Sequence, residues 1–132
     1  MTHIINSLDE ISHHYDALFV DLWGCVHNGI VAYTAAVEAL IEYRKNGGKV
    51  VLVTNSPKPR IGVEKQLLHF NVPKICYDTV ATSGDSARVA MFTGVVGKKI
   101  FFIGEPRDQL FFEPISIITV SYTHLRAHET EA

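Results

Sequence analysis

Residues 17–29 read ALFVDLWGCVHNG, a short apolar run that ends at Asp21 and passes into a glycine-containing loop. The run is apolar at successive positions, as a strand that is covered on both faces must be. Residues 49–53 and 79–82 are further runs of strand length, and segments with helical periodicity separate the three runs. Strands that alternate with helices are typical of βαβ units, so the sequence predicts an α/β fold with a parallel sheet.

The rest of the chain continues this alternation as far as residue 120. We expect helical segments at 7–15, 34–46, 59–70, 83–93 and 106–112, and further strands at 99–103 and 115–120.

The composition limits the classes of protein to which the chain can belong. The 132 residues include 12 basic and 14 acidic side chains and are 47% hydrophobic, which is enough for one packed domain and excludes disorder. The net charge of −2 argues against a nucleic-acid partner. No run approaches the roughly 18 apolar residues that span a bilayer, and the N-terminal residues lack a signal-peptide pattern. We therefore expect a cytoplasmic protein without a membrane partner, in which Cys25 and Cys76 are reduced.

Polar side chains follow three of the predicted strands. Asp21 ends the first, Thr54 and Asn55 follow the second, and Thr82 ends the third and is followed by Ser83. Ligands of open parallel sheets bind beyond the carboxyl ends of the strands. A carboxylate there can be a nucleophile or a cation ligand, and hydroxyl, amide and loop N–H groups can hold a phosphate. The alternative is that Asp21 and Thr54 only cap loops.

The motifs favour a ligand-binding site at the strand ends over residues that only cap loops. FVDLWGCVHNG (residues 19–29), LVTNS (52–56) and TSG (82–84) together resemble the haloacid dehalogenase (HAD) superfamily of phosphohydrolases. Within it they are most similar to class IIA and to a subfamily with tryptophan in the first motif. The resemblance covers residues 10–118. It implies a Rossmann-like, three-layer core whose N-terminal part is residues 1–83, and the beginning of an α/β cap domain at residues 84–119.

The resemblance also implies roles for individual residues. Asp21 would be the nucleophile that forms an aspartyl-phosphate, and its carboxylate and the backbone carbonyl of Trp23 would bind Mg²⁺. Thr54 would donate its hydroxyl to the phosphoryl oxygens. The remaining phosphate- or substrate-binding residues would be Asn55, Gly24 and Ser83.

The sequence departs from the family pattern in two ways. Trp23 stands where the family has a second aspartate, the general acid and base for the leaving group, and an indole cannot exchange a proton at neutral pH. His27 either substitutes for that aspartate or is an ordinary loop histidine. The family's lysine motif and the acidic pair that completes the Mg²⁺ site follow the cap domain and do not occur in the 132 residues. We therefore expect this chain to be inactive alone.

The last residues change character. Residues 120–132 are polar and resemble translated sequencing-adapter read-through, so we expect a non-native tail; the alternative is a genuine, loosely helical extension. A chain that ends within a domain would also leave a sheet edge exposed, through which it could aggregate or form homo-oligomers.

These observations lead to a functional hypothesis with two rivals. The hypothesis is a Mg²⁺-dependent HAD-type phosphatase that acts on a small phosphorylated metabolite and is truncated here. The rivals are a non-catalytic protein that binds phosphorylated ligands on the same scaffold, and a truncated product without a function of its own.

Overall fold

The computed structural model describes residues 3–105, 108, 111–113 and 118–121. Within it the chain forms two compact units, one that ends at Gly84 and one that begins at Asp85. Each unit is described by itself below.

The first unit is built on a parallel sheet of three strands. They are β1 (Ala17–Asp21), β2 (Lys49–Thr54) and β3 (Thr79–Thr82), in the spatial order β1-β2-β3. Asp21 is opposite Val53 in the register, and Thr54 is opposite Thr82. The alternating pattern in the sequence correctly predicted an α/β fold with a parallel sheet.

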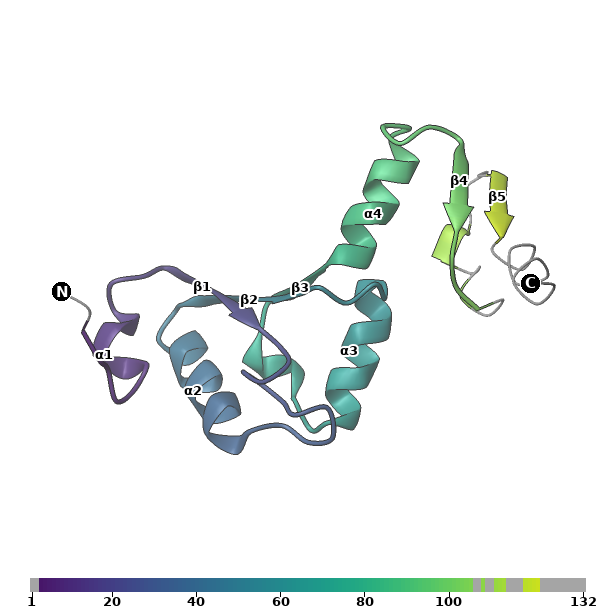
Figure 1. Ribbon diagram of the computed structural model, residues 1–132. Helices are drawn as coiled ribbons and strands as arrows, with labels where there is room; N and C mark the ends of the chain where they lie inside the picture. The colour runs from purple at the N-terminus through teal and green to yellow at the C-terminus, as the bar shows by residue number, and fades with distance from the viewer. Residues whose placement is uncertain (1–2, 106–107, 109–110, 114–117, 122–132) are drawn as a thin grey trace. The chain divides into compact units, whose positions relative to one another are not determined.

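Helices cover one face of this sheet. The unit contains α1 (Asp9–Ser12), α2 (Thr34–Lys45), α3 (Arg60–His69) and the 3₁₀ helix η1 (Lys74–Cys76). Figure 1 shows α2 and α3 on the same side of the strands. The side chains between sheet and helices form the core, because burying them removes apolar surface from water. Its fully buried members include Val26, Val50, Leu52, Leu67, Val72, Cys76 and Tyr77.

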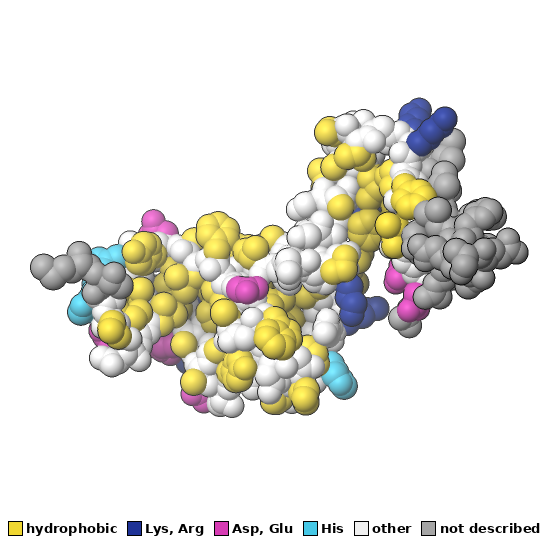
Figure 2. All heavy atoms as spheres, in the orientation of Figure 1, with side chains coloured by type: hydrophobic (Ala, Val, Ile, Leu, Met, Phe, Trp, Pro, Cys, Tyr) yellow, Lys and Arg dark blue, Asp and Glu magenta, His cyan; other side chains and the backbone are white. Residues whose placement is uncertain are grey.

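The opposite face of the sheet carries apolar side chains without a second layer of helices among the described residues of this unit. Phe19 in β1 is 77% exposed and Val53 in β2 is 40% exposed. Hydrophobic side chains are visible in Figure 2 on the side of the unit away from α2 and α3. Parallel sheets are normally covered on both faces. The first unit therefore supplies two of the three layers that the sequence predicted.

The second unit contains most of α4 (Ser83–Phe92) and the parallel strands β4 (Lys99–Phe102) and β5 (Ile118–Ser121). Arg88 in α4 donates hydrogen bonds to the backbone carbonyls of Phe111 and Glu113.

The structure describes only part of the strand predicted at 115–120 and of the tail predicted at 120–132. β5 (Ile118–Ser121) overlaps the end of the strand predicted at 115–120, and residues 115–117 of that prediction lie outside the described residues. β5 includes Val120 and Ser121, which belong to the predicted tail; the rest of that tail, 122–132, lies outside the described residues. Much of the helix predicted at 106–112 also lies outside them.

Among the described residues, no helix combines the length and the apolar character needed to cross a membrane.

Candidate active site

The parallel register brings the carboxyl ends of β1, β2 and β3 to one edge of the sheet. Asp21, Thr54 and Thr82 are the last residues of the three strands, and Thr54 and Thr82 are paired directly. The polar residues at predicted strand ends therefore share one edge, as the sequence led us to expect.

A hollow of about 320 Å³ lies at this edge. It brings together four of the residues singled out from the sequence, Trp23, His27, Thr54 and Asn55. Asp21, Gly24 and Ser83 are not among its lining residues. The full lining is Leu22, Trp23, His27, Thr54, Asn55, Ser56, Lys58, Val63, Gln66 and Leu67.

Asp21 is exposed at the end of β1. Its Oδ1 accepts a hydrogen bond from the backbone N–H of Leu22 at 2.8 Å. No hydrogen bond within the described part of the chain uses Oδ2, which leaves one carboxylate oxygen available to a ligand or an electrophile. The carboxylate is also close enough to His27 to affect its protonation electrostatically.

The loop after Asp21 folds back on itself. Val26 and His27 donate their backbone N–H groups to the carbonyl of Leu22, and Gly24 donates to the carbonyl of His27 at 2.8 Å. Gly24 has a φ of +80°, a conformation that glycine adopts without strain. Its own N–H is thus engaged within the loop, and a role for Gly24 in phosphate binding stays a prediction. In contrast, no described residue donates a backbone hydrogen bond to the carbonyl of Trp23.

The loop after β2 presents hydroxyl groups. The backbone N–H of Ser56 donates to Thr54 Oγ1, and that of Lys58 donates to Ser56 Oγ, both at 3.2 Å. Because each hydroxyl oxygen is used here as an acceptor, its proton remains available for a ligand.

The segment at Ser83 and Gly84 is tied to the same loop. Gly84 donates its N–H to the carbonyl of Ser56, and a Cβ at Gly84 would lie 2.2 Å from the Pro57 carbonyl oxygen. Only glycine permits this close approach. Ser83 is exposed beside it.

His27 is the most constrained polar side chain of the site. It is 6% exposed, and its Nδ1 accepts a hydrogen bond from the backbone N–H of Gly29 at 3.0 Å. Its ring packs against Phe70 with 4.8 Å between ring centroids. Burial lowers the pKa of His27 below its ordinary value, and the nearby Asp21 carboxylate partly opposes this shift.

The charge of the lining favours an anionic ligand. Lys58 is the one lining residue with a full charge at neutral pH, and it is accompanied by hydroxyl groups, two side-chain amides and a histidine. The sequence reading did not select Ser56, Lys58 or Gln66. Ser56 and Lys58 could have been predicted, because they lie within three residues of Asn55 in the sequence. Gln66 lies within α3, and no feature of the sequence indicates that it faces the site.

The site offers oxygen ligands to a divalent cation. The Asp21 carboxylate and the Trp23 carbonyl are hard oxygen donors, the kind that Mg²⁺ prefers. The described residues contain no group of three His, Cys, Asp or Glu side chains that could hold a metal. The oxygen donors present are thus of the type that binds Mg²⁺, and they supply part of its six octahedral ligands.

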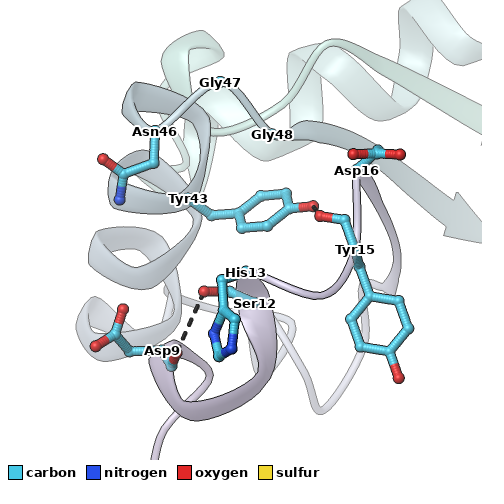
Figure 3. Close-up of a pocket in the computed structure, with 9 residues that line it drawn as sticks. All are labelled: Asp9, Ser12, His13, Tyr15, Asp16, Tyr43, Asn46, Gly47 and Gly48. Atoms are coloured by element: carbon cyan, nitrogen blue, oxygen red, sulfur yellow. Dashed lines mark hydrogen bonds between the residues drawn. The ribbon is translucent and has the colours of Figure 1, made fainter.

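A second hollow, of about 600 Å³, lies at the opposite, amino ends of the strands, where Tyr15 and Asp16 precede β1 and Gly47 and Gly48 precede β2. Figure 3 shows Tyr43 extending across it with its hydroxyl at the backbone of Tyr15, to whose carbonyl it donates at 2.6 Å. The ring of Tyr43 leaves no room for a side chain at Gly48, where a Cβ would lie 2.2 Å from it.

An ion pair joins α2 to the sheet at this same end. Arg44 donates to both carboxylate oxygens of Asp78, at 3.1 and 3.0 Å, and Asp78 also accepts the N–H of Val50 at 2.8 Å. These contacts hold the pKa of Asp78 below its usual range, the Val50 hydrogen bond most of all.

The chain is similar to known proteins. Residues 18–115 match the family described as haloacid dehalogenase-like hydrolase. A crystal structure of a hydrolase of the haloacid dehalogenase-like family from Brucella suis 1330 is similar, with a TM-score of 0.81 and 37% identity over 91% of this chain and 45% of that one. A hypothetical protein from Pyrococcus horikoshii OT3 shares the fold, with a TM-score of 0.61 and 21% identity over 87% of this chain and 44% of that one.

The chain therefore spans less than half the length of either solved structure. No curated protein sequence matches it.

Proposed function

The chain belongs to the haloacid dehalogenase-like hydrolase family, and we propose that it is the nucleophile-bearing part of a phosphatase. The observation that carries this proposal is the carboxyl edge of the sheet. There Asp21 keeps one carboxylate oxygen available, next to a loop that lines a hollow with one cation, several donors and no carboxylate.

Each residue at this edge has a separate role in the proposed reaction. A free oxygen of Asp21 attacks phosphorus, a bond forms between that oxygen and phosphorus, and the bond from phosphorus to the substrate oxygen breaks. The departing oxygen takes its proton from water, because Trp23 cannot supply one.

The hydroxyl of Thr54 and the amide of Asn55 hold the phosphoryl oxygens. Contacts from Ser83 and Gly24 stay predictions, because neither residue lines the hollow and the N–H of Gly24 is engaged with the His27 carbonyl. Water then attacks the aspartyl-phosphate and releases inorganic phosphate.

Mg²⁺ is the cofactor of this proposal. Asp21 and the Trp23 carbonyl would hold it, and when bound it would offset the repulsion between the carboxylate and the phosphate. The second carboxylate of the family's first motif is replaced by Trp23. This replacement is our reason to place the chain in the tryptophan-containing branch of class IIA.

The remaining features of the proposal concern the whole protein. Its substrate is a small phosphorylated metabolite, and residues 84–119 begin the cap domain that selects it. The exposed face of the sheet at Phe19 and Val53 is a surface through which the 132-residue chain would self-associate.

A second candidate function is a non-catalytic protein that binds phosphorylated ligands. It is favoured by Trp23, because general acid–base catalysis is worth roughly 10²–10⁴-fold and an indole cannot supply it. The hollow would then bind a phosphate without turning it over.

The deciding experiment compares the 132-residue chain with a version extended to the length of the Brucella relative. Hydrolysis of p-nitrophenyl phosphate is measured with and without Mg²⁺. We expect activity in the extended protein, little in the short chain, and a loss of at least about 10³-fold in Asp21→Asn, because the substitution removes the nucleophile. Asp16→Asn, at the other end of β1, is the matched control and should keep its activity.

Turnover that survives Asp21→Asn would contradict the nucleophile assignment. An extended protein that is inactive but still binds phosphate would favour the second candidate function. Full activity in the 132-residue chain would contradict the expectation that it is inactive alone.

A further inference from the structure

We propose that His27 is a ligand-binding residue that acts as a neutral donor, giving its Nε2–H to an oxygen of the anion in the hollow. This inference rests on the proposed function, since it assumes that the hollow receives a phosphate. This role differs from the two that the sequence suggested for His27, which were a general acid and an ordinary loop histidine.

The hydrogen-bond network assigns the tautomer. The backbone N–H of Gly29 can only donate, and it points at His27 Nδ1 over 3.0 Å, so Nδ1 must be an unprotonated acceptor. The proton of a neutral imidazole is then on Nε2. Gly29 can serve in this way because its φ of +88° lets the loop turn back within two residues of His27.

The surroundings hold the ring in one orientation. Phe70 packs against it, the backbone N–H and carbonyl of His27 bond to Leu22 and Gly24, and the residue is 6% exposed. With both backbone groups and Nδ1 engaged, Nε2–H is the polar group of His27 that has no partner among the described residues. A ring fixed in this way donates to a ligand without first losing conformational freedom.

The neighbours of His27 make an anion the fitting partner. His27 lines the hollow together with Thr54, Asn55 and Lys58, which contribute a hydroxyl, an amide and an ammonium group. Donors outnumber acceptors in this set, and phosphate oxygens are acceptors only. A phosphate would therefore satisfy the Nε2–H of His27 along with the other donors.

The tautomer and the contact can both be observed by NMR on the 132-residue chain. Long-range ¹H–¹⁵N spectra of the histidine rings distinguish protonated from unprotonated ring nitrogens, and side-chain correlations to the assigned backbone identify the His27 signals. We expect a protonated Nε2 and an unprotonated Nδ1. On titration with inorganic phosphate the Nε2 signal should shift and saturate together with the backbone amides of Thr54 and Asn55. The rings of His13 and His14, outside the hollow, should stay unchanged.

Two substitutions separate the donor from the shape of the ring. His27→Gln keeps an N–H donor near the position of Nε2, whereas His27→Asn keeps an acceptor for Gly29 but places no group at Nε2. We expect phosphate affinity to fall about 10-fold or more in His27→Asn and less than about 3-fold in His27→Gln, because one hydrogen bond to a charged ligand is lost only in the former. Thermal unfolding of both variants is measured in parallel.

The outcomes distinguish this inference from the proposed function. A proton on Nδ1, or phosphate shifts at Thr54 and Asn55 without one at His27, would overturn the inference and leave the phosphate site standing. Equal losses of affinity in the two variants would assign His27 a structural role and overturn it as well. An absence of phosphate shifts at Thr54, Asn55 and His27 alike would count against the site itself. The wild-type spectra decide the matter even if neither variant folds.

Discussion

The two ends of the three-stranded sheet in the first unit use their polar side chains in opposite ways. At the amino ends, Tyr43 donates to the Tyr15 carbonyl and Asp78 receives hydrogen bonds from Arg44 and the Val50 backbone. Lys49 adds a longer ion pair to the same carboxylate, at 3.7 Å. These polar groups connect segments that are distant in sequence, so they stabilise the fold.

At the carboxyl ends, three side chains make local hydrogen bonds. Thr54 and Ser56 accept backbone N–H groups two residues away, and His27 does the same with Gly29. Each of these side chains keeps a proton to donate. Of the two hollows described above, the larger lies at the amino ends of the strands, and the one lined by Thr54, Asn55 and Lys58 lies at the carboxyl ends.

Two glycines offer the strongest test of this contrast. Gly48→Ala and Gly84→Ala should each lower the free energy of unfolding by about 1–3 kcal/mol, since each adds a Cβ where there is no space. At Gly48 the neighbour is the ring of Tyr43, whereas at Gly84 it is the backbone of Pro57 and Lys58. Only Gly84→Ala should therefore displace the lining of the active-site hollow and weaken phosphate binding, by about 10-fold.

Urea unfolding and phosphate titration of the two variants measure these effects. Equal weakening of phosphate binding in Gly48→Ala would show that the two ends are not separate in function.

Asp78→Asn tests the amino end by itself. Arg44 and Asp78 are each about a quarter exposed, so we expect a loss of about 1–2 kcal/mol in the free energy of unfolding, with no change in phosphate affinity. Glu42→Gln, in the exposed pair with Lys45, is the control and should change stability by less than about 0.5 kcal/mol. A similar loss in both variants would mean that the Asp78 contacts add little.

The pH dependence of the Asp78 contribution follows from the direction of its pKa shift. Because the pKa of Asp78 is lower in the folded chain, its stabilisation is fully present above the ordinary range of an aspartate. It is lost as the pH falls through the lowered folded value. The stability difference between wild type and Asp78→Asn should accordingly be constant near neutrality and shrink in acid, as urea unfolding at a series of pH values would show.

Tyr43→Phe should have the smallest effect. It removes the hydroxyl that donates to Tyr15 and retains the buried ring, so we expect a loss of about 0.5–1.5 kcal/mol. Thermal unfolding measures it, and Tyr15→Phe, whose side chain is exposed, is the control. Weakened phosphate binding in Tyr43→Phe would again contradict the separation of the two ends.

The sequence predicted the architecture better than the detailed site. Strand ends at Asp21 and Thr54 are visible as changes from apolar to polar residues, and the parallel register brings them to one edge. The tautomer of His27 was not predictable, because it depends on a loop conformation at Gly29. Gln66 was not predictable either, since it comes from the side of α3 that only packing identifies. An exposed apolar face was expected of a chain that ends within a domain. That Phe19 would lie on it was not predictable, because an apolar residue in a strand gives the same pattern whether or not its face is covered.

The position of Trp23 has a practical consequence for spectroscopy. It is the single tryptophan of the chain, it lines the hollow, and its side chain is 72% exposed. Indole emission depends on contact with water and on nearby charges, so the intrinsic fluorescence of this protein comes from the wall of its candidate active site. A ligand that enters the hollow can thus be followed in real time without an attached dye, while the tyrosines at the amino ends of the strands contribute nothing to emission excited at the red edge of the indole band.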